Sequence, residues 1–335
     1  MDTRDILVHG FGLILDPSTM TMPIDEFLGK YGGYIDTLAI IAKSPEGVAY
    51  YPSNSAPRHS SFEGFFPVVS SIANDIGIKV YGVIYSNVDQ FLGKDPNFRI
   101  VKSGGVPVEG YVCPGQETYW HYLASVAQEV ASYDIEGIIL KDIAYPHEEY
   151  CFCDTCRHNF AMQTNITDRD FGLDYIKRSK ILYERWLEMR VSNIEQLVRT
   201  VVQTVKSQKN VKILPEIMVE KEIGYFDGAY VQYGEDYTRL IETSNHVMLS
   251  LNPWSQKIPP RDSEEYNKLI NLLTPFRELA SRGLKTTLFM VSPDEEMLES
   301  VDTIKSYLGS ENIFVQEQLP KNYLELRSRF LGLGV

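Results

Sequence analysis

The sequence is poor in cysteine and tryptophan and has no long apolar run. There are four cysteines and three tryptophans among 335 residues, and no stretch is long and apolar enough to cross a bilayer. Basic residues are also scarce relative to acidic ones, since 32 Lys and Arg stand against 45 Asp and Glu, for a net charge of −13. That balance argues against nucleic acid or an anionic membrane as the main partner.

Motifs of several common enzyme classes are absent as well. The sequence has no glycine-rich phosphate loop, no Gly-x-Ser-x-Gly elbow and no histidine-rich metal motif. Nucleotide chemistry, Ser-His-Asp hydrolysis and a catalytic histidine–metal site are therefore poorly supported. The first residues carry acids and no long apolar run, so no signal peptide is expected there, and a cytoplasmic location is expected.

The few cysteines follow one pattern. Cys151, Cys153 and Cys156 form Cys-x-Cys-x-x-Cys, and Cys113 lies upstream, beyond a predicted helix and strand. Cysteines this close cannot easily make two unstrained disulfides, whereas four thiolates suit one tetrahedral Zn²⁺ with no open position. The pattern predicts a structural zinc bound by all four, in a cysteine-rich loop at about 147–160. A disulfide from Cys113 to one of the trio, or inert thiols, are the alternatives.

Apolar β-branched runs alternate with amphipathic stretches along the chain. Continuous apolar runs are typical of buried parallel strands. The pattern predicts strands at 4–15, 34–43, 78–86, 135–142, 211–217, 246–252, 284–291 and 312–316. It predicts helices at 23–31, 61–76, 117–132, 168–207, 237–243, 263–282, 294–308 and 323–331. This alternation predicts an α/β fold, namely a (β/α)8 TIM barrel forming a single domain over residues 1–335. A doubly wound open sheet would show a similar alternation.

In such a barrel, chemistry lies at the carboxyl ends of the strands. Two acids fall there on neighbouring strands: Asp142 ends the run Gly-Ile-Ile-Leu-Lys-Asp, and Glu216 lies near the end of the next strand. Glycoside hydrolysis needs one carboxyl group to protonate the leaving oxygen and another to attack the sugar or activate water. Glu220 and Glu317 are reserve candidates for the second carboxylate. Lys141 could pair with an acid or point outside the barrel; because adjacent strand residues face opposite ways, it is expected to face away from the pocket.

Further polar and aromatic side chains occur at or just after the predicted strand ends. Tyrosine is abundant, at 21 residues, and its flat apolar face with a hydroxyl suits sugar recognition. A substrate pocket is therefore predicted at the carboxyl mouth of the barrel. Its expected carbohydrate-binding members are His9, Tyr85, Asn87, Tyr145, Tyr233, Asp236 and Trp254.

The segment 111–160 resembles glycoside hydrolase family 42. It has a Val-Cys-Pro motif around Cys113, then a helix, a strand ending in an acid, and the Cys-x-Cys-x-x-Cys motif from Cys151. The resemblance implies a (β/α)8 barrel with a cysteine-bound zinc and a general acid at the position of Asp142. That family has Asn-Glu where this chain has Lys-Asp, and a nucleophilic Glu at the end of strand seven where this chain has Ser-Pro-Asp at 292–294.

The run 137–146 also resembles uncharacterised glycosidase-like barrels near the α-amylase and family 42 superfamilies, which read Asp-Gly-Ile-x-Leu-Asp-x-x-x-Tyr-Pro at this strand. The segment 233–236 resembles a recurring Gly-Gln-Asp segment of the same group. In amylase-like barrels the strand-four Asp is the nucleophile and a strand-five Glu is the acid. The resemblance thus implies a retaining enzyme with Asp142 as nucleophile and Glu216 as general acid/base. The alternative, similar to family 42, makes Asp142 the general acid of a β-galactosidase.

The favoured function is a glycoside hydrolase or transglycosidase acting on O-glycosyl bonds, with a carbohydrate substrate and neither nucleic acid nor membrane as partner. An inactive carbohydrate-binding or scaffold barrel would suit the departures from the family 42 pattern. A lyase or aldolase would use Lys141 as a Schiff base, which needs a dry pocket and a lowered pKa. The sequence leaves a homo-oligomer open.

Overall fold

The computed structural model describes residues 11–20, 22–167, 171–219, 228–251, 263–291, 303–310 and 312–316. The strands are β1 (Phe11–Leu15), β2 (Thr37–Lys43), β3 (Lys79–Tyr85), β4 (Arg99–Val101), β5 (Pro107–Val112), β6 (Gly137–Lys141), β7 (Lys212–Met218), β8 (His246–Ser250), β9 (Lys285–Val291) and β10 (Asn312–Gln316). The helices are α1 (Ile24–Tyr31), α2 (Phe65–Asp75), α3 (Glu117–Ala131), α4 (Asp154–Thr164), α5 (Leu173–Lys177), α6 (Lys180–Lys206), α8 (Tyr237–Ser244) and α9 (Glu264–Ala280). Single turns are η2 (Pro17–Thr19), η3 (Gly32–Tyr34), η4 (Leu92–Lys94) and the π-helical η5 (Ala229–Tyr233).

Eight strands pair in parallel in the order β1-β10-β9-β8-β7-β6-β3-β2. The first strand, β1, pairs with both β10 and β2, so the ladder of strands returns to its start. The α/β class and the curled parallel sheet that the sequence predicts are confirmed. The part of the chain that the structure describes does not include a helix after every strand, so the full eightfold β/α repeat stays a prediction.

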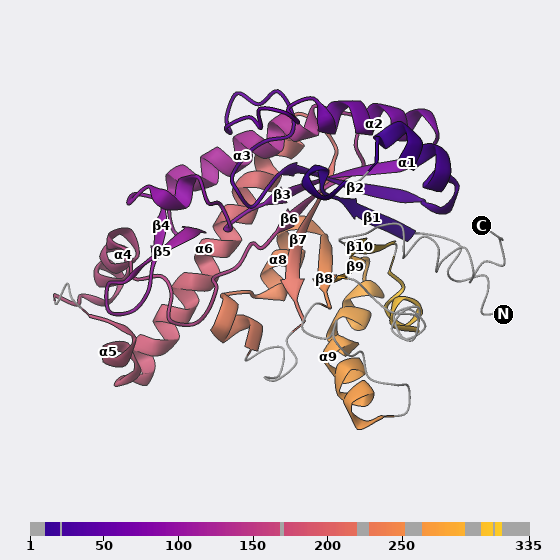
Figure 1. The fold of residues 1–335 in the computed structure, drawn as a ribbon. Helices are drawn as coiled ribbons and strands as arrows, with labels where there is room; N and C mark the ends of the chain where they lie inside the picture. The colour runs from indigo at the N-terminus through magenta and orange to yellow at the C-terminus, as the bar shows by residue number, and fades with distance from the viewer. Residues whose placement is uncertain are drawn as a thin grey trace.

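The parallel strands are buried on both faces, as their continuous apolar sequences predict, and every residue of β2 is buried. Inward side chains, among them Ile41, Ile139 and Leu214, form one cluster. Outward side chains join a larger core beneath the helices. In Figure 1, α2 and α3 lie on one side of the strands and α9 on the other. Side chains two positions apart on a strand point to the same face. Lys141 follows Ile139 by two positions and Glu216 follows Leu214 by two, so both point to the inner face of the sheet, like the inner cluster.

The predicted helix at 168–207 is two helices, α5 and α6, in the structure. The break falls at Arg178 and Ser179, because Ser179 is the N-cap of α6 and its side chain accepts a hydrogen bond from the Leu182 N–H at 3.4 Å. One face of α6 is buried from Trp186 to Val205. None of the helices in the described ranges has the length and apolar character that a bilayer-spanning segment needs.

The connection from β3 to α3 contains an antiparallel hairpin, β4 with β5, where the sequence predicts an irregular loop. The cysteine-rich loop after β6 runs directly into α4, which the sequence did not predict. In Figure 1 the hairpin lies with α4 and α5 at one side of the molecule. This side layer is built on the carboxyl ends of β3 and β6, and it contains the four cysteines.

Candidate active site and cysteine cluster

Three ionisable residues meet where β6 and β7 end. Lys141 is the last residue of β6, Asp142 follows it, and Glu216 lies in β7. The Lys141 Nζ is 3.2 Å from Glu216 Oε1, and the two residues are only 5% and 2% exposed. The N–H of Asp142 donates to Glu216 Oε2 at 2.9 Å. The Glu216 carboxylate is therefore bound by both the side chain and the main chain of the neighbouring strand end.

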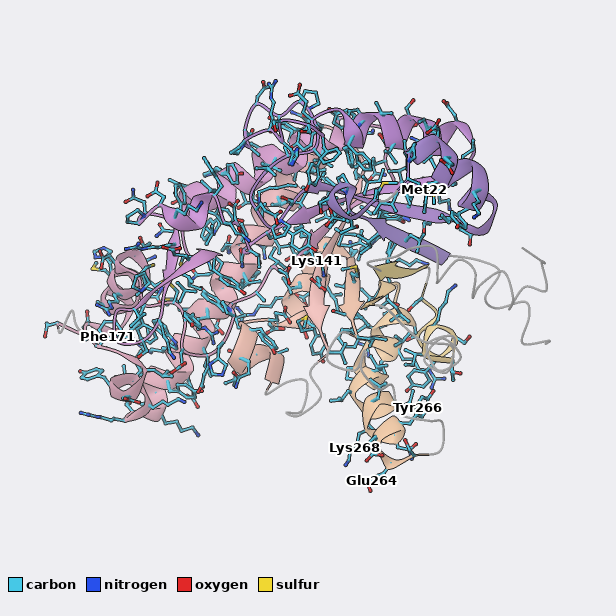
Figure 2. The ribbon with its side chains drawn as sticks, in the orientation of Figure 1. Met22, Lys141, Phe171, Glu264, Tyr266 and Lys268 are labelled. Carbon is cyan, nitrogen blue, oxygen red and sulfur yellow. The ribbon has the colours of Figure 1, made fainter. Side chains whose placement is uncertain are left out.

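Lys141 faces the interior of the ring of strands, so the prediction that it faces away is wrong. It lies on the same face as Ile139 of the inner cluster, and its Nζ is 5.8 Å from the centre of the Tyr85 ring. Figure 2 shows it in the middle of the molecule, among the strands. The next residue, Asp142, has a φ of 52°, in the left-handed region. That turn of the chain lets two consecutive residues both contact Glu216.

The surroundings of these groups set their protonation. Burial, with the nearby Glu216 charge, raises the pKa of Asp142 from 3.8 to about 6, against the opposing effect of Lys141. Burial alone would lower the pKa of Lys141, but the charges of Glu216 and Asp142 raise it overall. A protonated, ion-paired amine cannot attack a carbonyl, so the arrangement disfavours the Schiff-base alternative.

Two predicted substrate ligands, Tyr85 and Asn87, lie at the end of β3 beside Asp142. Tyr85 is the last strand residue and is 9% exposed. Asn87 is buried; its N–H donates to the Asp142 carbonyl and its Nδ2 donates to the Ala144 carbonyl, both at 3.2 Å. Asn87 thus supports the segment after β6, and direct contact of either side chain with a substrate stays a prediction.

Tyr145, Tyr233 and Asp236 lie on the segments that follow β6 and β7. Tyr145 is buried, and its N–H donates to the Tyr233 carbonyl at 2.9 Å. Asp236 is the N-cap of α8, where its Oδ1 accepts from the Thr238 N–H at 3.0 Å. Their roles as substrate ligands also stay predictions. Four residues named from the sequence lie outside the described ranges: His9, Glu220, Trp254 and Glu317.

Sequence reasoning missed a second buried ion pair, at the end of β2. Lys43 Nζ is 2.9 Å from Asp89 Oδ2, with both side chains fully buried, and it donates to the Tyr85 carbonyl at 2.8 Å. Burial lowers the pKa of Lys43, an effect that Asp89 opposes. A lysine that ends an otherwise apolar strand was the available signal, because a buried ammonium needs a partner. This pair fixes the chain next to Tyr85.

The four cysteines come together as their spacing predicts. Cys113 follows β5, Cys151 and Cys153 precede α4, and Cys156 lies in its first turn. All are buried, and their Sγ atoms lie within 4.8 Å of one another. No pair is joined in a disulfide, and the Sγ atoms of Cys113 and Cys156 are 3.4 Å apart. The cluster has the separation of ligands that share one metal ion.

The surroundings of the sulfurs fit a metal-bound thiolate site. The Gly115 N–H donates to Cys113 Sγ at 3.3 Å, and the Val101 N–H donates to Cys151 Sγ at 3.4 Å. Burial and the neighbouring sulfurs raise the pKa of the Cys113 thiol, so several thiolates in this space need a cation to compensate them. Four soft donors of this kind suit Zn²⁺ or another thiophilic metal.

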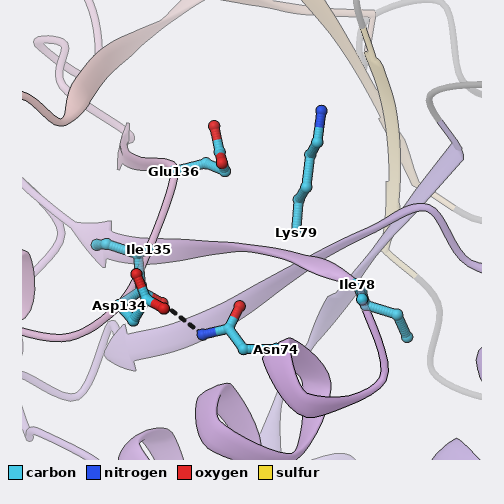
Figure 3. Close-up of a pocket in the computed structure, with 7 residues that line it drawn as sticks. Asn74, Ile78, Lys79, Asp134, Ile135 and Glu136 are labelled. Carbon is cyan, nitrogen blue, oxygen red and sulfur yellow. Dashed lines mark hydrogen bonds between the residues drawn. The ribbon is translucent and has the colours of Figure 1, made fainter.

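A pocket of about 220 Å³ lies at the opposite end of the sheet. Figure 3 shows the residues that line it. Lys79 begins β3 and Glu136 precedes β6, so this hollow lies at the amino ends of the strands. Across it, the Asn74 Nδ2 donates to the Asp134 carbonyl at 2.8 Å. Conserved chemistry in barrels of this kind lies at the carboxyl ends, so this pocket is separate from the cluster around Asp142.

Similar folds are known among glycoside hydrolases. No protein-family model matches the sequence, and no curated protein matches it. The glycoside hydrolase domain of PgaB (BpsB) from Bordetella bronchiseptica has a TM-score of 0.72 at 11% identity, over 97% of this chain and 98% of that one. The β-amylase catalytic domain from Paenibacillus polymyxa has a TM-score of 0.67 at 11% identity, over 98% and 99%.

A third solved structure, α-L-fucosidase isoenzyme 2 from Paenibacillus thiaminolyticus, has a TM-score of 0.65 at 16% identity. It covers 97% of this chain, which spans 49% of the fucosidase. At identities this low, the structural similarity shows a shared fold and nothing more. The activity of this chain has to be argued from its own residues.

Proposed function

We propose that the protein cleaves or transfers glycosidic bonds at the carboxyl ends of β6 and β7, with Asp142 and Glu216 as the acting carboxylates. The observation that carries the proposal is their contact: the Asp142 N–H binds Glu216 Oε2 while Lys141 pairs with Oε1. Two adjacent carboxyl groups in different electrostatic surroundings are what glycoside hydrolysis uses. The fold shared with glycoside hydrolases supports this class and a carbohydrate substrate.

The electrostatics favour Asp142 as the proton donor. Its raised pKa, about 6, keeps it protonated further toward neutral pH than an ordinary Asp. Glu216 is bound by the Lys141 ammonium, which stabilises a carboxylate that attacks the sugar or activates water. These roles are the reverse of the amylase-like assignment, and the role of Asp142 agrees with the alternative that resembles family 42, in which the nucleophile is a Glu at the end of strand seven. With Glu216 as nucleophile the reaction would retain configuration.

The test is hydrolysis of an aryl glycoside panel covering both anomers, with an α-L-fucoside and soluble α-glucan included because similar folds are named for fucosidase and β-amylase. On a substrate that the parent hydrolyses, Asp142→Asn should lose at least about 100-fold in kcat, and less on leaving groups that need no proton. Glu216→Gln should be inactive, with azide restoring turnover as a glycosyl azide. The Asp75→Asn variant, at an exposed site on α2, is the control.

Three outcomes decide between the proposals. Parent-like activity in either site variant would remove that residue from the mechanism. A glycosyl azide of inverted configuration from Asp142→Asn would restore the amylase-like roles, because azide would then stand in for the nucleophile; an azide of retained configuration from that variant agrees with Asp142 as the acid/base. Sugar binding by calorimetry without turnover of any substrate would favour the carbohydrate-binding barrel.

We also infer that the cysteine cluster binds one Zn²⁺ in a structural site. Four thiolates would fill its tetrahedral coordination and leave no position for substrate. Cys113 would tie the β4–β5 hairpin to α4 through Cys156, and thereby fix the side layer against β6. Four thiols without a disulfide agree with a reducing, cytoplasmic location. The closed ladder of parallel strands supports the proposal of one (β/α)8 domain over residues 1–335.

A further inference from the structure

Arg190, in the middle of α6, is fully buried although its side chain is charged. Its Nη1 donates to the Val231 carbonyl at 2.5 Å. Its Nη2 donates to the carbonyls of Gln232 and His147 at 2.7 and 2.9 Å. The guanidinium also lies over the Tyr145 ring, 4.6 Å from its centre. One side chain thus binds three main-chain carbonyls from two separate segments.

These segments are the ones that leave the candidate active site. His147 belongs to residues 142–150, here called the β6 loop, which begins at Asp142. Val231 and Gln232 lie in η5 and belong to residues 228–235, here called the β7 loop. The two loops therefore follow the strands that hold Asp142 and Glu216, and Arg190 lies where they meet.

The contact between the loops leaves no spare room. Gly234 of the β7 loop has a φ of 70°, and a Cβ there would lie 2.9 Å from Tyr145 Cδ2 and 3.4 Å from Arg190 Cβ. The Tyr145 OH accepts from the Asn193 Nδ2 at 3.0 Å, which ties the ring to α6 as well. Neither loop can shift here without moving the other or the helix.

Packing alone does not account for an arginine at this position. Removing an ion from water costs several kcal/mol, and burial lowers the pKa of Arg190 to about 10, which still leaves it charged near neutral pH. An apolar side chain would fill the space without that cost. The guanidinium instead offers five N–H donors in a rigid planar fork, which can bind several acceptors at fixed angles.

We propose that Arg190 is a positioning residue of the candidate active site, which holds the β6 loop and the β7 loop together so that Asp142 keeps its place beside Glu216. The proposal rests on the proposed glycosidase activity. Arg190 acts through main-chain carbonyls and touches neither carboxylate in the contacts described above. Because displacing a catalytic group by about 1 Å can cost about 100-fold in rate, such a role should be visible in kinetics.

The kinetic test compares Arg190→Lys with Arg199→Lys. Lysine keeps the charge, but its three donors sit on one nitrogen and it lacks the planar fork whose Nη1 and Nη2 reach the carbonyls of both loops. Therefore kcat should fall about 100-fold with little change in KM. The pH at which activity falls on the alkaline side should also decrease, because a loosened Asp142 is better solvated. Arg199 lies on the same helix, partly exposed, and pairs with Glu195, so its variant should match the parent.

Hydrogen exchange tests the same role without needing activity. In Arg190→Lys, amides of both loops should exchange faster together, while α3 and the ladder between β2 and β3 keep their protection. Uniformly faster exchange, or parent-like exchange in both loops, would overturn the proposal. If the loops loosen together but the parent cleaves no glycoside, the proposed activity fails while the coupling of the loops is supported. If Arg190→Lys does not fold, Gly234→Ala is the substitute variant. It disturbs the same contact from the β7 loop instead of from α6.

Discussion

At the scale of single residues, Asp142 combines a left-handed backbone with a carboxyl group that is costly to ionise. Its pKa is raised from 3.8 to about 6. Between these values the unfolded chain ionises first, so the group's contribution to stability is complete below pH 4 and is lost as pH rises through about 6. An asparagine has no charge to lose and accepts a φ of 52° without strain.

We therefore expect Asp142→Asn to be more stable than the parent at pH 8 by about 1–3 kcal/mol, with little difference at pH 4. The same variant should lose activity, so stability and function would change in opposite directions. Urea denaturation at the two pH values measures the effect, and Asp75→Asn is the control. A stability gain that is equal at both pH values would contradict the assigned pKa.

The second residue-scale prediction concerns the buried pair of Lys141 with Glu216. Removing one partner leaves the other charge buried and unpaired, so Lys141→Met should destabilise the protein by about 3–5 kcal/mol. Adding Glu216→Leu should recover most of that loss. The exposed pair of Lys180 with Glu184, 3.7 Å apart on α6, is the matched control, and Lys180→Met should cost less than about 1 kcal/mol. Equal costs at the two sites, by urea denaturation, would show that Lys141 is solvated.

The sequence placed Asp142 and Glu216 together because adjacent parallel strands end at one edge. It gave the wrong direction for Lys141 because alternation was counted from Asp142, as if that residue were still in the strand. The left-handed φ at Asp142 ends the alternation there, and a conformation of this kind in a residue other than glycine has no sequence signature strong enough to predict it.

At the scale of elements, the strands of the parallel sheet were predicted from long apolar runs, and the structure has a strand at each predicted range. Short or weakly amphipathic elements were not predicted. In α4 only Cys156 and Phe160 are buried, so its sequence has no apolar stripe to reveal it. The hairpin of β4 and β5 lies in a stretch with the turn residues Gly104 and Gly105, both at positive φ. The break before α6 did have a signal, since Ser179 is a typical N-cap residue.

The element-scale prediction concerns the contact of α6 with the cysteine-rich loop. The Trp186 ring stacks on Phe152, 4.3 Å between centres, and meets Phe160 edge-on at 5.2 Å. Trp186→Ala should cost about 3–5 kcal/mol and speed the loss of bound metal to a chelator, because Phe152 lies between two of the cysteines. Ile181→Ala, at a site that is 65% exposed on the same helix, should change neither denaturation nor metal release.

At the scale of the whole molecule, the ring of strands is closed by β1 and β10, which lie at opposite ends of the described chain. The sequence predicts that closure only through the count of strands, because no local signal links residues so far apart. The side layer is different: β4 and β5 follow β3 along the chain, α4 and α5 follow β6, and the cysteine cluster joins the two parts. A metal bound there would stabilise the side layer. The ladder of parallel strands would still be stabilised by its own buried apolar side chains.

Metal removal should therefore unfold the side layer before the barrel. We expect purified protein to contain about one zinc per chain, and a strong chelator to lower the thermal midpoint by about 5–10 °C, since it removes a ligand that binds only the folded state. Limited proteolysis should then cut within 99–112 and 143–160 first, because these segments hold the cysteines or adjoin them. The Cys156→Ser variant should start from the lower midpoint and respond little to chelator. The contrary result is purified protein that contains no metal, has reduced thiols and shows the same thermal midpoint with and without chelator. It would show that burial alone holds the cysteines together.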